Sequence, residues 1–228
     1  MTRGATRLGV FGGTFDPVHF GHLDAAEAAH RALQLDEVIF LPAHLAPHRE
    51  SDPRATMFHR FALVSLAVDP LPWCRASDLE MARTGRSYTY DTLVTLHADG
   101  WDPSQLFFII GTDAFAEVAL WRAFAQVVDG TNFAVVGRSG TTLEAAVART
   151  PALHDRIRPL ALAREPSAET AVYLIEAATR NISSTQIRSR LAAGQPIGDL
   201  VPEAVERHII RHGLYGAVDR LHGDTQVS

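Results

Sequence analysis

Two histidines follow a glycine pair near the start of the chain, in the stretch VFGGTFDPVHFGHL of residues 10–23. Gly12 and Gly13 end an apolar run, and His19 and His22 stand three residues apart where a helix is expected to begin. A sharp turn there exposes backbone N–H groups, and two imidazoles on one helix face add hydrogen-bond donors. The stretch therefore predicts a phosphate-binding site.

The histidine spacing alone leaves three interpretations open. An isolated pair of this kind more often caps or packs a helix, and it can also ligate a transition metal, although no clear spacing here supplies a third ligand. The glycine pair and the strand-turn-helix context favour anion binding. The stretch lacks the GxGxxG spacing of dinucleotide-binding folds, and since all 21 basic residues are arginine, it is not a lysine-containing P-loop.

A second candidate anion site is the stretch NISSTQIRSRL at residues 181–191. Ser183, Ser184 and Thr185 precede an expected helix, where hydroxyls usually cap free N–H groups. Three hydroxyls exceed what capping needs, and Arg188 lies one helical turn beyond Thr185. With the helix dipole, these groups suit the outer phosphates of a triphosphate.

The stretch FFIIGTDAF and the following Trp121 form a third group. Gly111 ends a very apolar run, and Asp113 is a candidate partner for a ribose or for Mg²⁺. The alternatives are that Asp113 caps the next helix and that Trp121 belongs to the core.

Two further polar stretches follow expected strands. HLAPHRE places His44, His48 and Arg49 after the second strand, on the same edge of the sheet as the first motif. SYTYDTL places polar groups ahead of a helix, where capping by Ser87 or Thr89 is the alternative.

Three residues elsewhere are expected to play structural parts. His208 and His212, four residues apart, predict a solvated face or a subunit contact rather than a metal site. The single Cys74 excludes an internal disulfide, and its apparent strand favours a structural thiol over a reactive one.

The elements that must position these residues alternate between strand and helix. Apolar, strand-like runs lie at residues 7–11, 37–42, 73–79, 105–111, 132–137 and 171–176. Helix-like stretches lie at residues 21–35, 56–68, 88–99 and 114–128, with later helices within 181–196 and 201–215. The alternation predicts an α/β fold with a doubly wound, mostly parallel sheet, which binds ligands at the carboxyl ends of its strands.

One domain is expected over residues 1–228. Its core spans about 7–191, a helical extension follows at about 192–216, and 217–228 form a tail. Residues 139–167 are expected to form a surface connection with a helix at 141–149.

The composition bounds the class of ligand. A formal net charge of −5 and a pI near 6.1 argue against a nucleic-acid polymer or an anionic membrane as partner and favour small molecules. We find neither a secretion leader nor an apolar run of about 18 residues, so a cytoplasmic protein is expected. A homo-oligomer is left open.

These motifs together resemble one family. GGTFDPVHFGH resembles the HxGH signature of nucleotidyltransferases in the form typical of bacterial nicotinate-nucleotide adenylyltransferases, and ISSTQIR resembles the carboxyl-terminal signature of that family. APHR, SYTYDTL and IIGTDAF with Trp121 extend the resemblance over residues 8 to about 191. It implies a Rossmann-like nucleotidyltransferase fold and transfer of AMP from ATP to nicotinate mononucleotide, with Mg²⁺, giving deamido-NAD and pyrophosphate.

The resemblance also implies the parts of particular residues. The residues expected at ATP are Gly12, Gly13, Thr14, Phe15, His19, His22, Gly111, Asp113, Ser184, Thr185 and Arg188. The catalytic ones are His19, His22 and Arg188, with His22 at the α-phosphate. The residues expected at the mononucleotide are His48, Arg49, Tyr88, Thr89 and Trp121. No side-chain metal ligand is assigned, because Mg²⁺ is expected mainly on the ATP phosphates.

Two other functions are weighed beside this one. The closest alternative is an enzyme that prefers nicotinamide mononucleotide or accepts both nucleotides, and the more distant one is a non-catalytic nucleotide sensor on the same fold. Arg122 departs from the family pattern, in which a second aromatic residue often follows the tryptophan.

Overall fold

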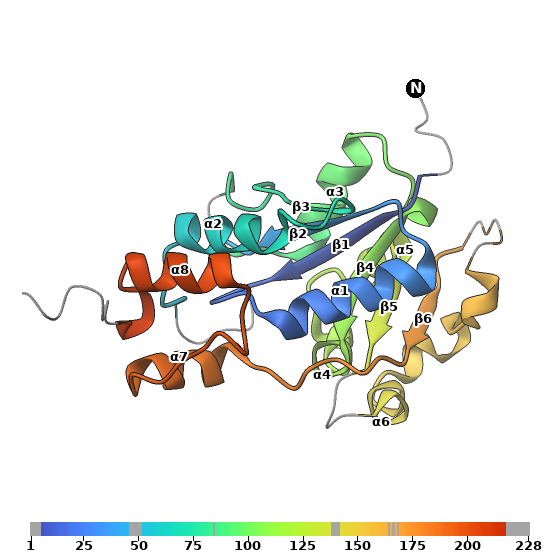
Figure 1. Cartoon of the computed structure of the whole chain (residues 1–228). Coiled ribbons are helices and arrows are strands. Elements are labelled where there is room, and N and C mark those ends of the chain that lie inside the picture. Colours follow the sequence, from blue (N-terminus) through green and yellow to red (C-terminus); the bar gives the residue numbers. More distant parts are fainter. Residues whose placement is uncertain are drawn as a thin grey trace, which may run out of the picture.

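The computed structural model describes residues 6–45, 52–83, 85–137, 142–163, 165, 167 and 169–217. Their six strands form one parallel sheet in the order β3-β2-β1-β4-β5-β6 (Figure 1). The strands are β1 (Leu8–Gly13), β2 (Glu37–Pro42), β3 (Cys74–Ala76), β4 (Leu106–Gly111), β5 (Asn132–Val136) and β6 (Val172–Ile175). The doubly wound prediction is confirmed, and every pair of neighbouring strands described is parallel.

Helices cover both faces of this sheet. Because successive side chains of a strand point to opposite faces, alternate apolar residues pack against different helices. Val38 and Phe40 pack in the cluster that contains α1 (Phe20–Leu33) and α2 (Met57–Val68). Ile39 and Leu41 face the other cluster, with α3 (Thr89–Ala98) and α5 (Phe124–Gly130).

The remaining helical elements are short or lie at the end of the chain. They are η1 (Pro103–Gln105), α4 (Thr112–Phe115), η2 (Val118–Leu120), α6 (Leu143–Ala148), η3 (Pro151–Arg156), η4 (Leu160–Leu162), α7 (Ser184–Ala192), α8 (Glu203–Arg211) and η5 (Leu214–Gly216). Within the described part of the chain, no helix has both the length and the apolar composition needed to span a membrane.

The strand order creates a crevice between β1 and β4. From β1 the chain builds β2 and β3 on one side, and β4 then returns to pair with β1 on the other side, with Leu8 opposite both Glu37 and Leu106. The loops that follow β1 and β4 therefore diverge, and ligands of such sheets bind at this point of reversal.

The helix expected at residues 114–128 is interrupted, so that prediction is wrong. Trp121 has extended backbone angles of φ −72° and ψ 145°, and Ala123 has a left-handed φ of 56°. The Trp121 ring meets Phe108 edge-on at 5.7 Å between ring centroids. This contact with β4 requires a chain direction that a continuous helix would not provide.

The strand expected at 73–79 is shorter than predicted, since β3 covers only Cys74–Ala76. Cys74 is half-buried. Burial, together with the nearby Glu37 carboxylate, raises the pKa of its thiol to about 12. The thiol therefore stays protonated, which agrees with the predicted structural part.

His212 is exposed, as a solvated face requires, whereas His208 is half-buried. Its Nε2 lies 3.1 Å from Nδ1 of His59 on α2, and the ring of His212 lies 5.0 Å from that of His59. Burial, with the neighbouring His212, lowers the pKa of His208. The histidines thus join α8 to α2 within one chain.

Arg60 on α2 ties the ends of two strands together, although it is almost completely buried. Its Nη1 donates to the carbonyl oxygens of Thr14 (2.8 Å) and Ala43 (2.6 Å), and its Nη2 donates to that of His44 (3.1 Å). The segments that follow β1 and β2 are therefore held by one guanidinium.

Replacing Arg60 should destabilise the whole fold. Arg60→Met keeps much of the apolar volume but leaves three carbonyl groups without their donor, so we expect the free energy of unfolding to fall by about 3 kcal/mol in urea denaturation. The control is Arg31→Met, which removes an exposed ion pair with Glu27 and should change stability by less than about 0.5 kcal/mol. Equal effects of the two substitutions would contradict the role of Arg60 in holding the segments after β1 and β2 together.

Candidate active site

The loop between β1 and α1 (residues 14–19) turns sharply because the Phe15 ring folds back over the end of the strand. Phe15 has a left-handed φ of 49°. A Cβ atom on Gly13 would stand 2.9 Å from Cζ of that ring, so a side chain there would displace Phe15. The glycine at this position is thus explained by packing as well as by the turn.

The two histidines of this segment stack on each other at the start of α1. Their ring centroids are 3.7 Å apart, and the backbone N–H of His19 donates to Nδ1 of His22 at 3.3 Å. His19 is buried, whereas His22 is half-buried and lines a cavity. Because Nδ1 of His22 accepts a hydrogen bond, the neutral ring carries its proton on Nε2 and remains a donor.

Gly21, between the histidines, allows the segment that contains Arg180 to lie close to the start of α1. A Cβ atom there would lie 3.0 Å from the carbonyl oxygen of Arg180 and 3.2 Å from Nδ1 of His19. Arg180 belongs to the segment between β6 and α7, and its side chain pairs with Asp24 on α1. The absence of a side chain at Gly21 therefore lets this segment approach α1.

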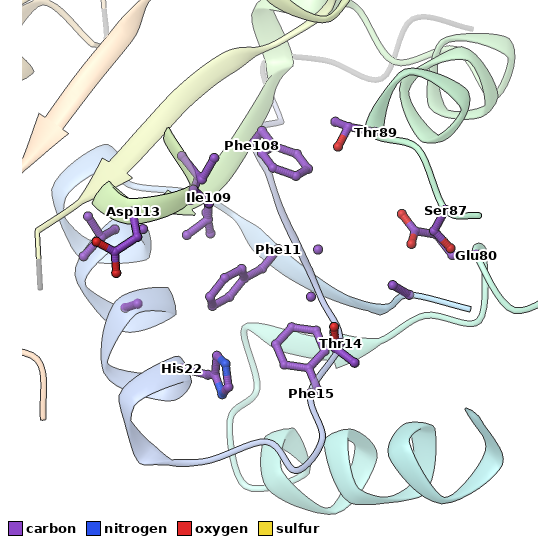
Figure 2. Close-up of a pocket in the computed structure, with 18 of the residues that line it drawn as sticks. Phe11, Thr14, Phe15, His22, Glu80, Ser87, Thr89, Phe108, Ile109 and Asp113 are labelled. Carbon is purple, nitrogen blue, oxygen red and sulfur yellow. The ribbon is translucent and has the colours of Figure 1, made fainter. Parts of the chain in front are cut away.

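A cavity of about 350 Å³ lies at the carboxyl ends of β1 and β4 (Figure 2). Ten residues expected at ATP or at the mononucleotide line it: Gly12, Gly13, Thr14, Phe15, His22, Tyr88, Thr89, Gly111, Asp113 and Trp121. The structure thus brings together groups from three of the motifs found in the sequence.

Four other predicted residues do not line this cavity. His19 lies behind His22, and the remaining three are at the start of α7. The Ser184 hydroxyl donates to the Pro17 carbonyl at 2.9 Å, while Arg188 donates to the Asp16 carbonyl at 2.7 Å and to the Thr185 hydroxyl at 3.1 Å. The start of α7 therefore packs against the β1–α1 loop beside the cavity. His48 and Arg49 lie outside the described residues.

The aromatic wall of the cavity carries an arginine in place of a second aromatic ring. The guanidinium carbon of Arg122 lies 4.9 Å from the centroid of the Tyr88 ring, and Nη1 of Arg122 pairs with Asp91 at 3.2 Å. This cation–π contact covers one face of Tyr88. Trp121 is half-buried, and it both packs against Phe108 and lines the cavity.

The buried carboxylate of Asp16 was not singled out in the sequence, although it lies between the glycine pair and the histidines. Its Oδ2 accepts the N–H of Arg54 at 2.8 Å, and its Oδ1 accepts the N–H of Ala55 at 3.0 Å and the hydroxyl of Tyr215 at 2.9 Å. Burial and the Asp16 carboxylate raise the pKa of Tyr215 well above its usual range, so the phenol keeps its proton. Asp16 thus joins the β1–α1 loop to two distant segments.

Comparison with known proteins agrees with this fold. The family model described as cytidylyltransferase-like matches residues 10–190, so the chain is a nucleotidyltransferase by class. A "Probable nicotinate-nucleotide adenylyltransferase" of Thermoanaerobacter sp. (strain X514) is 36% identical over 92% of this chain and 94% of its own length. One of the same name from Roseiflexus sp. (strain RS-1) is 37% identical over 91% of this chain and 97% of its own length. The chain belongs to the nicotinate-nucleotide adenylyltransferase family.

A solved structure supports the fold independently. The nicotinic acid mononucleotide adenylyltransferase of Plasmodium falciparum, complexed with NaAD, superposes with a TM-score of 0.68. The match covers 92% of this chain and 97% of that one, at 18% sequence identity. The Rossmann-like arrangement predicted from the sequence is thereby confirmed.

Removing the charge of Asp16 should disturb the site together with the fold. In Asp16→Asn one acceptor oxygen becomes an NH₂ group that faces other donors, so we expect a loss of about 2 kcal/mol in unfolding free energy and a fall in turnover. Urea denaturation and a pyrophosphate-release assay measure the two effects. The exposed Asp69→Asn serves as the control, and a stable Asp16→Asn enzyme with full turnover would refute this part for Asp16.

Proposed function

We propose that the cavity binds ATP and nicotinate mononucleotide side by side for direct transfer of AMP. A phosphate oxygen of the mononucleotide attacks the α-phosphorus of ATP in line, and the bond from that phosphorus to the bridging oxygen of pyrophosphate breaks. A phosphate oxygen is already an anionic nucleophile, so the reaction needs positioning and charge neutralisation rather than a base or a lysine.

His22 is the residue to which we assign stabilisation of the α-phosphate. The observation that carries the proposal is its place on the wall of a cavity that also contains Tyr88 and Trp121, in a member of this family. The Nε2–H of its neutral ring can donate to a phosphate oxygen, and protonation would add positive charge. His19 supports this ring by stacking.

We assign the outer phosphates of ATP to the start of α7. Ser184, Thr185 and Arg188 lie beside the β1–α1 loop, and a helix amino terminus and a guanidinium both attract phosphate. Arg188 is half-buried, so its charge is only partly screened by solvent. Gly111 and Asp113, at the end of β4, are assigned to the ribose of ATP.

The pyridine ring is assigned to the side of the cavity formed by Trp121 and the start of α3. The first N–H groups of a helix have no acceptor within the helix, and Tyr88, the N-cap residue of α3, makes no side-chain cap hydrogen bond. N–H groups near Thr89 suit a carboxylate, and the Trp121 face suits a flat ring. His48 and Arg49 stay predicted contacts of the mononucleotide.

We propose that Mg²⁺ enters with ATP and stays mainly on its phosphate oxygens. Mg²⁺ usually keeps several waters and takes only one or two protein carboxylates, so it needs few ligands from the protein. When bound, the ion would neutralise charge on the departing pyrophosphate. We place this reaction in the cytoplasm, as expected from the sequence.

Pyrophosphate release with ATP and Mg²⁺ tests the proposal when nicotinate mononucleotide, nicotinamide mononucleotide and phosphopantetheine are compared. We expect kcat/KM for the nicotinate form to exceed that for the amide at least about tenfold, because helix N–H groups favour a carboxylate. Preference for the amide would leave the proposed chemistry unchanged but would show that the enzyme is specific for nicotinamide mononucleotide. Binding of ATP without turnover of any acceptor would contradict the proposal and favour a sensor.

A further inference from the structure

A carboxyl group is buried in the cavity wall beside the start of α3. Glu80 lies in the segment between β3 and α3, it lines the cavity, and only 6% of its surface is exposed. Figure 2 shows it next to Ser87, on the side of the cavity where Thr89 lies. An acidic group here calls for an explanation, because we assign this side of the cavity to an anionic ligand.

Two hydroxyls direct their protons to Glu80. The Thr92 hydroxyl donates to Oε1 of Glu80 at 2.7 Å, and the Ser87 side chain makes a second hydrogen bond to this carboxylate. The Ser87 oxygen also accepts the backbone N–H of His44 at 2.9 Å. An oxygen that accepts an N–H keeps its single proton for another partner, so Glu80 is the acceptor of both hydroxyls.

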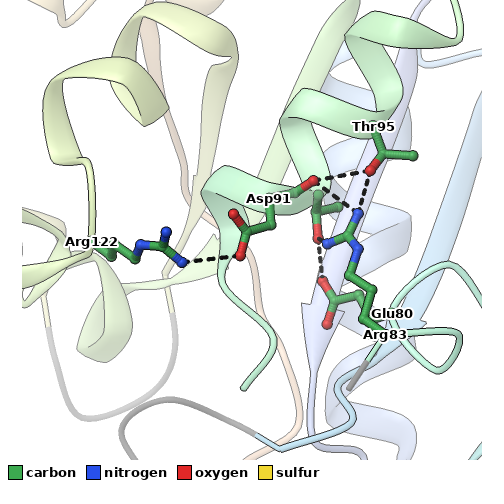
Figure 3. Close-up of polar contacts among 6 residues, drawn as sticks. Glu80, Arg83, Asp91, Thr95 and Arg122 are labelled. Atoms are coloured by element: carbon green, nitrogen blue, oxygen red, sulfur yellow. Dashed lines mark hydrogen bonds and ion pairs between the residues drawn. The ribbon is translucent and has the colours of Figure 1, made fainter. Parts of the chain in front are cut away.

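The Thr92 hydroxyl is also held by Arg83. Nη1 of Arg83 donates to the Thr92 hydroxyl at 3.2 Å, and Nη2 donates to the Asp91 carbonyl at 2.8 Å and to Thr95 (Figure 3). Asp91 pairs in turn with Arg122, the residue that covers Tyr88. The network therefore connects the buried carboxyl to the cavity wall.

The pKa of Glu80 is raised above its ordinary value. Burial raises the pKa of Glu80, while the hydrogen bonds from Thr92 and Ser87 and the charge of Arg83 act in the opposite direction. Other titratable or charged side chains on the surrounding elements are Asp78, Arg86 and Tyr88 between β3 and α3, Tyr90, Asp91 and His97 on α3, Arg122 beyond η2 and His44 after β2.

We propose that Glu80 is a positioning residue that determines how the acceptor nucleotide is held. Its carboxylate binds Ser87, just before the N-cap residue of α3, and Thr92, in the first turn, and so fixes both sides of the helix start. Through Ser87 it also holds the helix start against His44. The first turn of α3, whose Thr89 lines the cavity, is thereby held in one position. The inference rests on the proposed function, because it assumes that this turn receives the pyridine carboxylate.

The test is Glu80→Gln, which keeps the shape of the side chain but offers only one acceptor oxygen. We expect the KM for nicotinate mononucleotide to rise about tenfold, while kcat and the KM for ATP change less than about twofold. Ser87→Ala, which removes one hydroxyl, should raise the same KM. The double variant should be no worse than Glu80→Gln alone, because both changes break one connection.

The pH dependence supplies a readout that a purely structural role would not change. Protonation removes acceptor capacity, so the wild-type KM for the mononucleotide should rise as the pH falls through the pKa of Glu80. This rise of KM at low pH should be absent in Glu80→Gln. The matched control is Glu144→Gln on α6, an exposed residue whose substitution should leave all three constants and the pH profile unchanged.

Several outcomes would overturn the inference. An unchanged KM for the mononucleotide in a folded Glu80→Gln enzyme would do so, and so would an equal rise in both KM values. If Glu80→Gln does not fold, an unchanged KM in Ser87→Ala would decide against it. A wild-type enzyme that fails to use nicotinate mononucleotide would instead refute the proposed function, so the two failures are distinguishable.

Discussion

The Asp16 carboxylate is the contact on which the arrangement of the site depends. It lies in a loop that must leave β1, reverse direction and start α1 with two histidines facing one side. The loop cannot satisfy this buried charge by itself, so it binds N–H groups of Arg54 and Ala55 and the phenol of Tyr215. Arg60 binds the same loop through a carbonyl. Two distant parts of the chain, the start of α2 and the segment of Tyr215, thus fix the loop that carries the histidines before any ligand arrives, and such preorganisation is what electrostatic catalysis requires.

This rigidity suits a reaction in which the protein supplies no nucleophile. The charge that accumulates on the transferring phosphate must be met by fixed donors, and in the proposed mechanism these are histidine, arginine, hydroxyls and helix starts rather than lysine. The donors come from opposite ends of the sequence, since α7 packs on the loop after β1. The strand order explains this meeting, because the crevice between β1 and β4 is where the chain reverses its direction across the sheet.

The strands could be predicted from local patterns, because a short run of apolar residues is itself the sequence signal of a buried strand. β2 was expected at residues 37–42, and the structure has Glu37–Pro42. The helix expected at 114–128 failed because its break depends on the packing of Trp121 against Phe108, which no local pattern records. Glu80 was missed for a similar reason: its burial and partners come from segments that only the folded chain brings together. The residues of the candidate site that belong to sequence motifs could be predicted. Residues such as Glu80, which hold those motifs in place, could not.

Turnover of His22→Ala at saturating substrates shows whether a preformed histidine stabilises the transferring phosphate. We expect kcat to fall about 10²- to 10³-fold while ATP binding and the unfolding free energy change little, since the loss falls on the transition state. The exposed His154→Ala is the matched control and should keep wild-type turnover. A folded His22→Ala enzyme with nearly wild-type kcat would contradict the account, because the stacked pair would then be only a structural start of α1.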